Sequence, residues 1–212
     1  MLPKIPTVAR NFREIGRDFY TRGWVLGTSG NFSAVLSRTP LKLAITASSV
    51  SKGAITPADV LVINADGVPI GRRVGRPSAE TFLHVAVARV RGAGAVLHTH
   101  SVWSTTLSEV HASQGGIVLT GFEMLKGLEG VRTHEHTEWI PIFGNAQDIR
   151  ALAVSVEAML KARPDVHGFL LRGHGLYTWG DDLAQARRHV EIFEFLLEAS
   201  GRMRAMQPRG KR

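Results

Sequence analysis

The chain has 212 residues, of which 44% are hydrophobic and 21% are charged, as in ordinary globular proteins. This length is enough for one substantial core, and no apolar run approaches the roughly 18 residues of a membrane-spanning helix. Cysteine is absent, which excludes disulfides and thiolate chemistry. We therefore expect one domain, residues 1–205, in a cytoplasmic protein without a signal peptide.

The formal net charge of +8 raises the question of a nucleic-acid-binding function. Much of this excess lies at the end of the chain, where five basic residues occur without an acid: Arg202, Arg204, Arg209, Lys211 and Arg212. We interpret residues 206–212 as a basic, solvated C-terminal tail. The remaining surplus is small and suits an anionic small molecule such as a phosphate ester. We expect neither a nucleic acid nor a membrane as a partner.

The first elements surround a glycine-rich turn. Apolar residues at spacings of three and four predict a helix over 8–23. The turn, residues 27–33, follows and includes Thr28 and Asn31. It is able to present backbone N–H groups and hydroxyls to an anion, although a plain tight turn has the same composition. Two strands, 32–36 and 41–46, are predicted next.

A second hydroxyl-rich loop, residues 46–53, contains Ser48 and Ser49. Two such loops, each beside an apolar segment, favour a phosphate site more than either loop alone. The sequence then predicts a strand over 60–64. Pro77-Ser78-Ala79-Glu80 begins the next helix, with Ser78 as a cap and Glu80 as a favourable acid in the first turn.

Apolar residues 93–97 lead into His98-Thr99-His100. Side chains alternate along a strand, so the two imidazoles point to the same side. Imidazole is the commonest side-chain ligand for transition metals, and the spacing therefore predicts a metal site. The alternative is a buried strand that ends in two solvated histidines. A helix over 102–110 follows.

Glu123 is the acid of a short segment, residues 121–127, with apolar neighbours. A carboxyl in such surroundings would be desolvated and would have a raised pKa, as a general acid or base requires. An ordinary exposed glutamate is the alternative. A second H-x-H, His134 and His136, is a rival metal site, or else a polar stretch before the strand 139–143.

The last part of the chain supplies a third histidine. After a helix over 145–163, a buried strand is predicted from residue 168, and it runs through Gly173-His174-Gly175. A ligand from this distant strand would complete a three-histidine site with open positions, the layout of a catalytic metal centre. Residues 176–179 continue this strand, Gly180 ends it, and a helix from 181 to about Met203 follows. The order of elements predicts an α/β fold with a mixed, largely antiparallel sheet.

Five motifs, in their order along the chain, resemble those of the class II aldolase and adducin-head family. The resemblance covers nearly the whole chain and implies an α/β/α sandwich. Segments 121–127 and 172–180 look like the methylthioribulose-1-phosphate dehydratase branch of that family. The motifs are Thr28-Ser29-Gly30-Asn31, Ser48-Ser49, Pro77-Ser78-Ala79-Glu80, His98-Thr99-His100 and Gly173-His174-Gly175.

The resemblance implies one Zn²⁺ per subunit, held by His98, His100 and His174, and it sets the rival H-x-H aside. It also implies that Glu123 is the catalytic acid and base. The aldolases' glutamate falls at Glu80, where some dehydratases of the branch have a cysteine nearby. The role of Glu80 therefore stays open between a neighbour of the metal, a second acid or base, and a helix cap.

For the phosphate, the resemblance supports contacts from Thr28, Asn31, Ser48 and Ser49. The paired phosphate-binding serines of the aldolases correspond to Ser78 and Ala79, so one hydroxyl is lost there.

The reaction implied by this branch is dehydration of 5-methylthioribulose 1-phosphate to 2,3-diketo-5-methylthiopentyl 1-phosphate, a step of methionine salvage. Family membership also implies a homotetramer with active sites at subunit interfaces. Two alternatives remain at this point. One is a zinc aldolase that acts on a ketose phosphate and depends on Glu80. The other is a non-catalytic interaction domain like the adducin head, against which the intact histidines argue.

Overall fold

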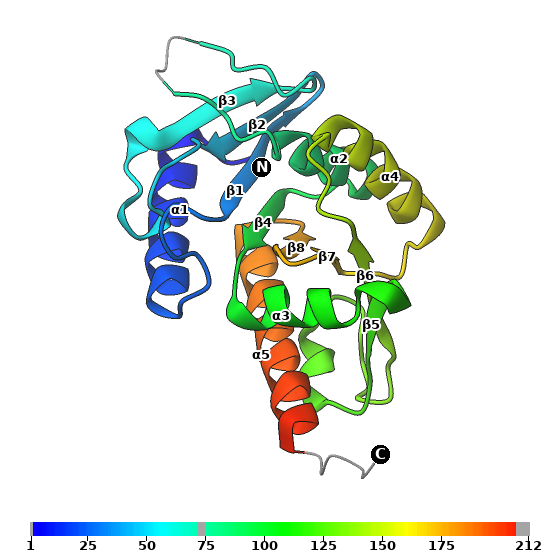
Figure 1. The fold of residues 1–212 in the computed structure, drawn as a ribbon. Helices are drawn as coiled ribbons and strands as arrows, with labels where there is room; N and C mark the ends of the chain where they lie inside the picture. Colours follow the sequence, from blue (N-terminus) through cyan, green and yellow to red (C-terminus); the bar gives the residue numbers. More distant parts are fainter. Residues whose placement is uncertain (1, 72–74, 207–212) are drawn as a thin grey trace.

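An eight-stranded sheet in the order β3-β2-β1-β4-β8-β7-β6-β5 organises the molecule, a computed structural model that describes residues 2–71 and 75–206 (Figure 1). Within this described sheet, β6 and β7 are parallel and the other neighbouring strands are antiparallel. The strands are β1 (Asn31–Arg38), β2 (Leu41–Thr46), β3 (Val60–Asn64), β4 (Ala95–Thr99), β5 (Gly116–Leu119), β6 (Glu138–Phe143), β7 (Gly168–Leu171) and β8 (Gly175–Gly180).

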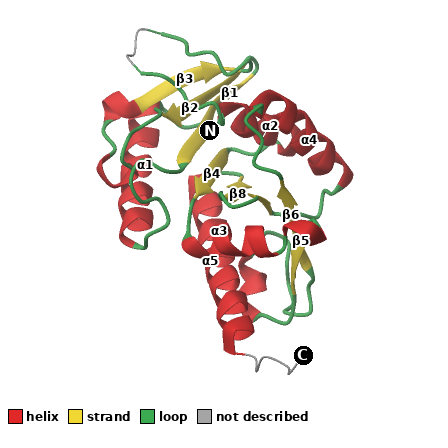
Figure 2. Ribbon diagram, in the orientation of Figure 1, coloured by secondary structure: helices red, strands yellow, loops and turns green. Residues whose placement is uncertain are grey.

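Helices cover both faces of the sheet, which confirms the predicted α/β/α sandwich (Figure 2). In β4, Ala95 and Leu97 pack with α1 and α5, whereas Val96 between them packs with α2 and α4. Alternation along this buried strand therefore supplies both layers of core. The helices are α1 (Ile5–Thr21), α2 (Thr81–Arg91), α3 (Val102–Val110), α4 (Ile149–Ala162) and α5 (Leu183–Met206), with short turns η1 (Lys52–Ala54), η2 (Pro57–Asp59), η3 (Ala112–Gln114) and η4 (Glu123–Gly127).

Most predicted elements are present, and most differences lie at their ends. The single strand predicted over 168–179 is wrong, because residues 172–174 form a turn, with Gly173 at φ 59°, that divides it into the antiparallel strands β7 and β8. Strands β2 and β3 and helix α3 have the predicted bounds. Helix α4 begins at Ile149 and not at 145, because the side chain of Asp148 accepts a hydrogen bond from the N–H of Ala151 and caps the helix there. Strand β5 was not predicted, because its four residues are too short to show a period.

The structure describes only the first residue of the predicted tail, 206–212. Helix α5 continues to Met206, the first residue assigned to that tail, and residues 207–212 lie outside the described part. The domain boundary at residue 205 stays a prediction. None of the helices within residues 2–71 and 75–206 combines the length and the hydropathy needed to span a membrane.

A buried acid lies beneath the end of β4. Thr99 Oγ1 donates a hydrogen bond of 2.7 Å to Oε1 of Glu194 on α5, and Glu194 is almost completely buried. Burial raises the pKa of Glu194 to about 7, from an ordinary value of 4.5. The folded state therefore retains a proton on this carboxyl at pH values where the unfolded chain has lost it.

We expect Glu194→Gln to change how stability depends on pH. A raised folded-state pKa stabilises the protein fully below pH 4.5, and that contribution is lost as the pH rises through 7. Between pH 4 and pH 8, the free energy of unfolding of the wild type should therefore fall by roughly 3 kcal/mol relative to the variant. Denaturant unfolding of both proteins across this range measures the difference. Parallel pH profiles would contradict the prediction.

Candidate metal centre and its cavity

Three histidines from three segments converge on one point. His98 lies near the end of β4, His100 follows the strand, and His174 lies in the turn between β7 and β8. Their Nε2 atoms are 2.8 Å apart for His98 and His100, 3.1 Å for His100 and His174, and 3.3 Å for His98 and His174. Tetrahedral zinc with Zn–N bonds of about 2.0–2.1 Å requires ligand atoms roughly 3.4 Å apart. The donor set therefore fits a zinc-sized ion.

The other ring nitrogens are held by oxygen atoms outside the cluster. Nδ1 of His98 donates to the carbonyl oxygen of Leu176 over 2.9 Å, and Nδ1 of His174 donates to Oδ1 of Asn145 over 3.1 Å. These bonds place the lone pair of each ring on Nε2, facing the centre, as is usual for histidines that bind metals. Burial also lowers the pKa of His100 to about 4, so this ring is neutral at physiological pH. Asn145 was not singled out from the sequence.

Glycine at position 175 allows the close approach of β4 and β8 behind these ligands. A Cβ atom on Gly175 would lie 2.0 Å from the carbonyl oxygen of Thr99 and 3.2 Å from Cε1 of His98. Any larger residue would push the two strands apart, and the imidazole of His98 with them. The close packing of β4 against β8 therefore requires glycine at position 175, beside His174.

Glu80 joins the three histidines as a fourth member of the cluster. Its Oε1 lies 3.1 Å from Nε2 of His174, and its Oε2 lies 3.8 Å from Nε2 of His98. Burial opposes ionisation, but the contacts with His174, His98 and Asn31 outweigh it and hold the pKa of Glu80 below its ordinary value. Glu80 is the N-cap residue of α2, yet its side chain makes no capping hydrogen bond. The helix-cap interpretation is therefore wrong.

A buried chain of hydrogen bonds orients Glu80. The side chain of Asn31 donates to Oε2 of Glu80, and its Oδ1 accepts from Nε2 of His84. Nδ1 of His84 lies 2.8 Å from Oγ of Ser33, and burial lowers the pKa of His84 to about 4, so the ring is neutral. The side chain of Asn31, predicted to contact phosphate, is thus engaged with Glu80. His84 was not predicted from the sequence, although it lies four residues after Glu80 on one helix face.

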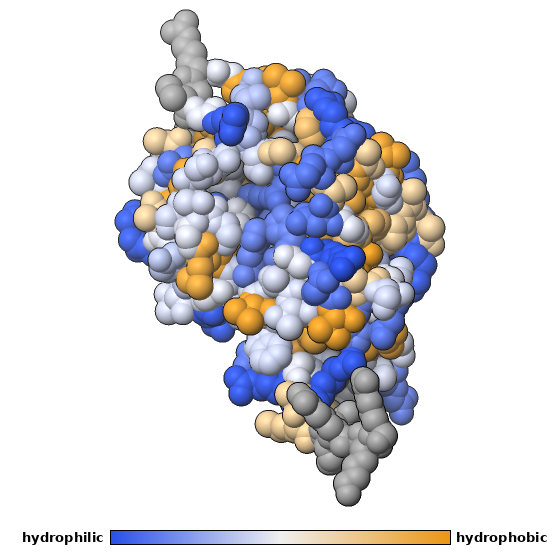
Figure 3. Space-filling view, viewed as in Figure 1, coloured by the Kyte–Doolittle hydropathy of each residue, from blue (hydrophilic) through white to orange (hydrophobic). Residues whose placement is uncertain are grey.

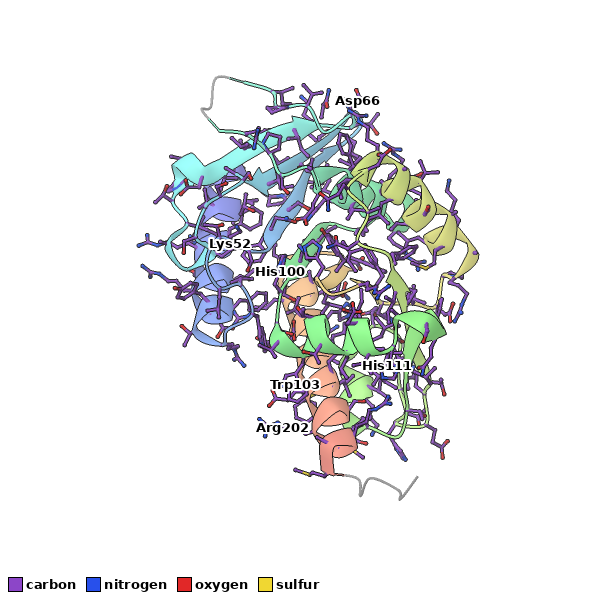
Figure 4. All side chains as sticks on the ribbon, viewed as in Figure 1. Lys52, Asp66, His100, Trp103, His111 and Arg202 are labelled. Atoms are coloured by element: carbon purple, nitrogen blue, oxygen red, sulfur yellow. The ribbon has the colours of Figure 1, made fainter. Side chains whose placement is uncertain are left out.

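A cavity of about 360 Å³ opens beside the cluster, and Glu80, His100 and His174 line it. The two predicted hydroxyl-rich loops also line this cavity, with Thr28, Asn31, Ser48 and Ser49 among their lining residues. Figure 3 shows hydrophilic residues gathered across the middle of this face, and Figure 4 labels His100 and Lys52, which reach the cavity from the end of β4 and from η1. The fold therefore brings the predicted phosphate loops and the predicted metal ligands to one cavity.

Lys52 joins the two hydroxyl-rich loops. Its Nζ donates to the carbonyl oxygens of Thr28 (2.9 Å) and Val50 (2.7 Å), one in each loop. The side chain is buried, and this burial lowers the pKa of Lys52 to about 8. A buried cation between two hydroxyl loops favours an anionic ligand. The sequence showed a lysine in this loop, but its burial depends on tertiary packing.

Glu123 does not have the environment expected from the sequence. Its side chain, in η4, is 73% exposed, and Lys126 Nζ donates to its Oε1 over 2.6 Å. This hydrogen bond lowers the pKa of Glu123, so the predicted desolvation and raised pKa are wrong for a single subunit. Within the described residues, Glu123 is not among those that line the cavity.

The rival H-x-H does not form a ligand pair. Nδ1 of His134 faces the exposed Glu123, with 3.8 Å to its Oε2. His136 instead contacts Glu138 and, through it, His167. The two histidines diverge because the backbone N–H of His136 donates to the carbonyl oxygen of Thr133 and closes a turn over 133–136, so the alternation of a strand does not apply to them.

The chain is similar in sequence to a known protein family and to named enzymes over most of its length. The sequence model of the Class II Aldolase and Adducin N-terminal domain matches residues 10–200. The methylthioribulose-1-phosphate dehydratase of Sorangium cellulosum (strain So ce56) is 48% identical over 195 residues, covering 92% of this chain and 91% of the relative. The enzyme of the same name from Methylococcus capsulatus is 42% identical over 202 residues, covering 95% and 96%.

Solved structures share the fold at lower identity. The l-fuculose-1-phosphate aldolase of Thermus thermophilus superposes with a TM-score of 0.76 and 24% identity, covering 98% of this chain and 100% of the other. A sugar-phosphate aldolase from Thermotoga maritima has a TM-score of 0.70 and 16% identity, covering 97% and 99%. These likenesses show the class II aldolase fold.

Proposed function

Because the chain belongs to the family of class II aldolases and adducin N-terminal domains, we propose that it is a metal-dependent lyase that dehydrates 5-methylthioribulose 1-phosphate. The product is 2,3-diketo-5-methylthiopentyl 1-phosphate, and the reaction belongs to methionine salvage. The observation that carries this proposal is the likeness, at 42% to 48% identity over more than nine tenths of each chain, to dehydratases of that name. The histidine cluster and the polar cavity supply the site that such a reaction needs.

We assign zinc to His98, His100 and His174, whose three nitrogens face one point beside the cavity. Zinc is favoured because three imidazoles suit it, and because the cavity leaves room for substrate oxygens on the open side. A bound divalent ion acts as a Lewis acid that polarises those oxygens. The carboxylate of Glu80 lies beside these ligands, where its negative charge offsets part of the positive charge of a bound ion.

The substrate phosphate is assigned to the hydroxyl-rich loops. Thr28, Ser48 and Ser49 line the cavity there, and Lys52 supplies a positive charge between the loops. A phosphate held at this side fixes the carbon chain against the histidine side, so that binding energy positions the reacting carbons. Asn31 also lines the cavity, where its side chain donates to Glu80 and holds that carboxylate in place.

Glu123 is assigned as the acid and base, supplied by a neighbouring subunit of a homotetramer. Its exposure on a single subunit, and its place outside that subunit's own cavity, are compatible with a role at an interface. The carboxylate of Glu123 takes the proton from C3 of the substrate. It then returns a proton to the C4 hydroxyl, which leaves as water, and the resulting enol tautomerises to the diketone.

Turnover of 5-methylthioribulose 1-phosphate by the zinc-loaded protein tests this function. We expect the diketone to form in a metal-dependent reaction and no carbon–carbon cleavage to occur. Because Glu80 lies inside the metal cluster, the aldolase alternative predicts instead that ketose phosphates are split and that Glu80→Gln abolishes the cleavage. If the protein neither dehydrates nor cleaves any ketose phosphate, the result would favour a non-catalytic interaction domain.

A further inference from the structure

A second group of metal-ligating side chains lies away from the cavity. It consists of His136, Glu138 and His167, whose ligand atoms all lie within 4.8 Å of one another. Nε2 of His136 is 2.9 Å from Oε2 of Glu138, and Nδ1 of His167 is 3.0 Å from the same oxygen. We call these three residues the second cluster. The proposed reaction does not use any of them.

The parallel pairing of β6 and β7 creates this second cluster. Glu138 is the first residue of β6, and His167 immediately precedes β7, so parallel strands bring both residues to the same edge of the sheet. His174 follows the other end of β7. The four residues of β7 span about 13 Å, and the second cluster is therefore a separate site from the catalytic one.

Glu138 carries a carboxyl that is almost fully buried, with 1% of its side chain exposed. A buried carboxylate is retained only where cations or hydrogen-bond donors compensate for its lost hydration. Oε1 accepts the backbone N–H of His167 over 3.0 Å, whereas Oε2 faces the two imidazoles. One carboxylate oxygen thus lies within about 3 Å of two imidazole nitrogens, one from each histidine.

We infer that the second cluster binds a second zinc ion, through Nε2 of His136, Oε2 of Glu138 and Nδ1 of His167. His167 is oriented for this role, because its Nε2 donates to the carbonyl oxygen of Glu129 over 2.9 Å and leaves Nδ1 to face the ion. His136 is 27% exposed, so the ion and a water ligand have access from solvent. Two nitrogens, one carboxylate oxygen and one water complete a tetrahedral zinc site.

The surroundings favour zinc over a harder cation. Calcium and magnesium prefer sites made entirely of oxygen ligands, and the second cluster offers one carboxylate. Two imidazole nitrogens and one carboxylate oxygen are instead a ligand set that zinc accepts.

The second ion would hold the segment that connects η4 to β6. This segment contains His136, and its Glu129 is also fixed from α5, because the N–H of Glu129 donates to Nε2 of His189 over 3.2 Å. Glu123 lies in η4, directly before the segment. The second ion is therefore structural, and it stiffens the part of the chain that presents Glu123.

Zinc titration of the full-length, metal-stripped protein tests this inference. We expect two equivalents per subunit for the wild type and one for His136→Ala and for His167→Gln. His134→Ala is the matched control, since this histidine belongs to the same H-x-H but lies outside the second cluster, and it should retain two equivalents. His100→Ala should retain one, and the double variant His100→Ala/His136→Ala should bind none.

Thermal unfolding of the His100→Ala variant provides a readout independent of activity. Added zinc should raise its melting temperature, because an ion that binds only the folded state stabilises it by mass action. The same addition should leave His100→Ala/His136→Ala unchanged. A single equivalent in the wild type, or two equivalents in a folded His136→Ala protein, would overturn the inference. In that case Glu138 and the two histidines form a hydrogen-bonded ion pair alone.

Discussion

His98→Ala is expected to leave a folded protein that has lost its catalytic metal and its activity. The side chain of His98 is fully buried, and its Nε2 is one of the three converging nitrogens. Even outer partners of metal ligands contribute about 10- to 100-fold to metal affinity, so loss of a ligand should lower affinity by more than roughly 100-fold. Metal content at the catalytic site and turnover at saturating substrate measure the effect.

Asn145→Ala is the graded control for this prediction. It removes only the hydrogen bond to Nδ1 of His174 and leaves all three ligands in place. We expect metal affinity to fall by about 10- to 100-fold while turnover of the fully loaded variant stays measurable. A His98→Ala protein that retains the wild-type metal content and turnover would contradict the assignment of the catalytic site.

Glu123→Gln is expected to lower turnover by about 10²- to 10⁴-fold, the usual contribution of a general acid or base, while the metal content stays unchanged. The amide keeps the shape of the side chain but cannot take the C3 proton. Because Glu123 is exposed and makes its hydrogen bond to Lys126, the substitution should leave the fold intact. Unchanged turnover would remove Glu123 from the mechanism and direct attention to Glu80.

Mixed oligomers distinguish a Glu123 that serves a neighbouring subunit from one that serves its own. When inactive Glu123→Gln and His98→Ala chains are co-assembled, some sites combine an intact His98 with an intact Glu123 from the adjacent chain. Random assembly in equal amounts should restore about a quarter of the wild-type activity. If each subunit used its own Glu123, the mixture would stay inactive.

Much of the fold follows from local pattern. Strands β2 and β3 and helix α3 lie where periodicity and turn residues place them, because these signals depend on neighbours along the chain. The convergence of His98 and His100 is of the same kind. The two-residue spacing places His98 near the end of β4 and His100 directly after it, and their Nε2 atoms lie 2.8 Å apart.

The remaining features depend on contacts between distant segments, and only the tertiary structure decided them. His174 reaches His100 across 74 positions because β8 pairs with β4, and His84 holds Asn31 because α2 packs over β1. The sequence also could not show that Glu123 is exposed. Its neighbours Phe122 and Leu125 pack into the core, whereas the side chain of Glu123 turns outward. The second cluster depends on the parallel pairing of β6 and β7. A sequence pattern records which side chains are near each other along the chain, whereas burial and convergence are set by the packing of elements far apart in it.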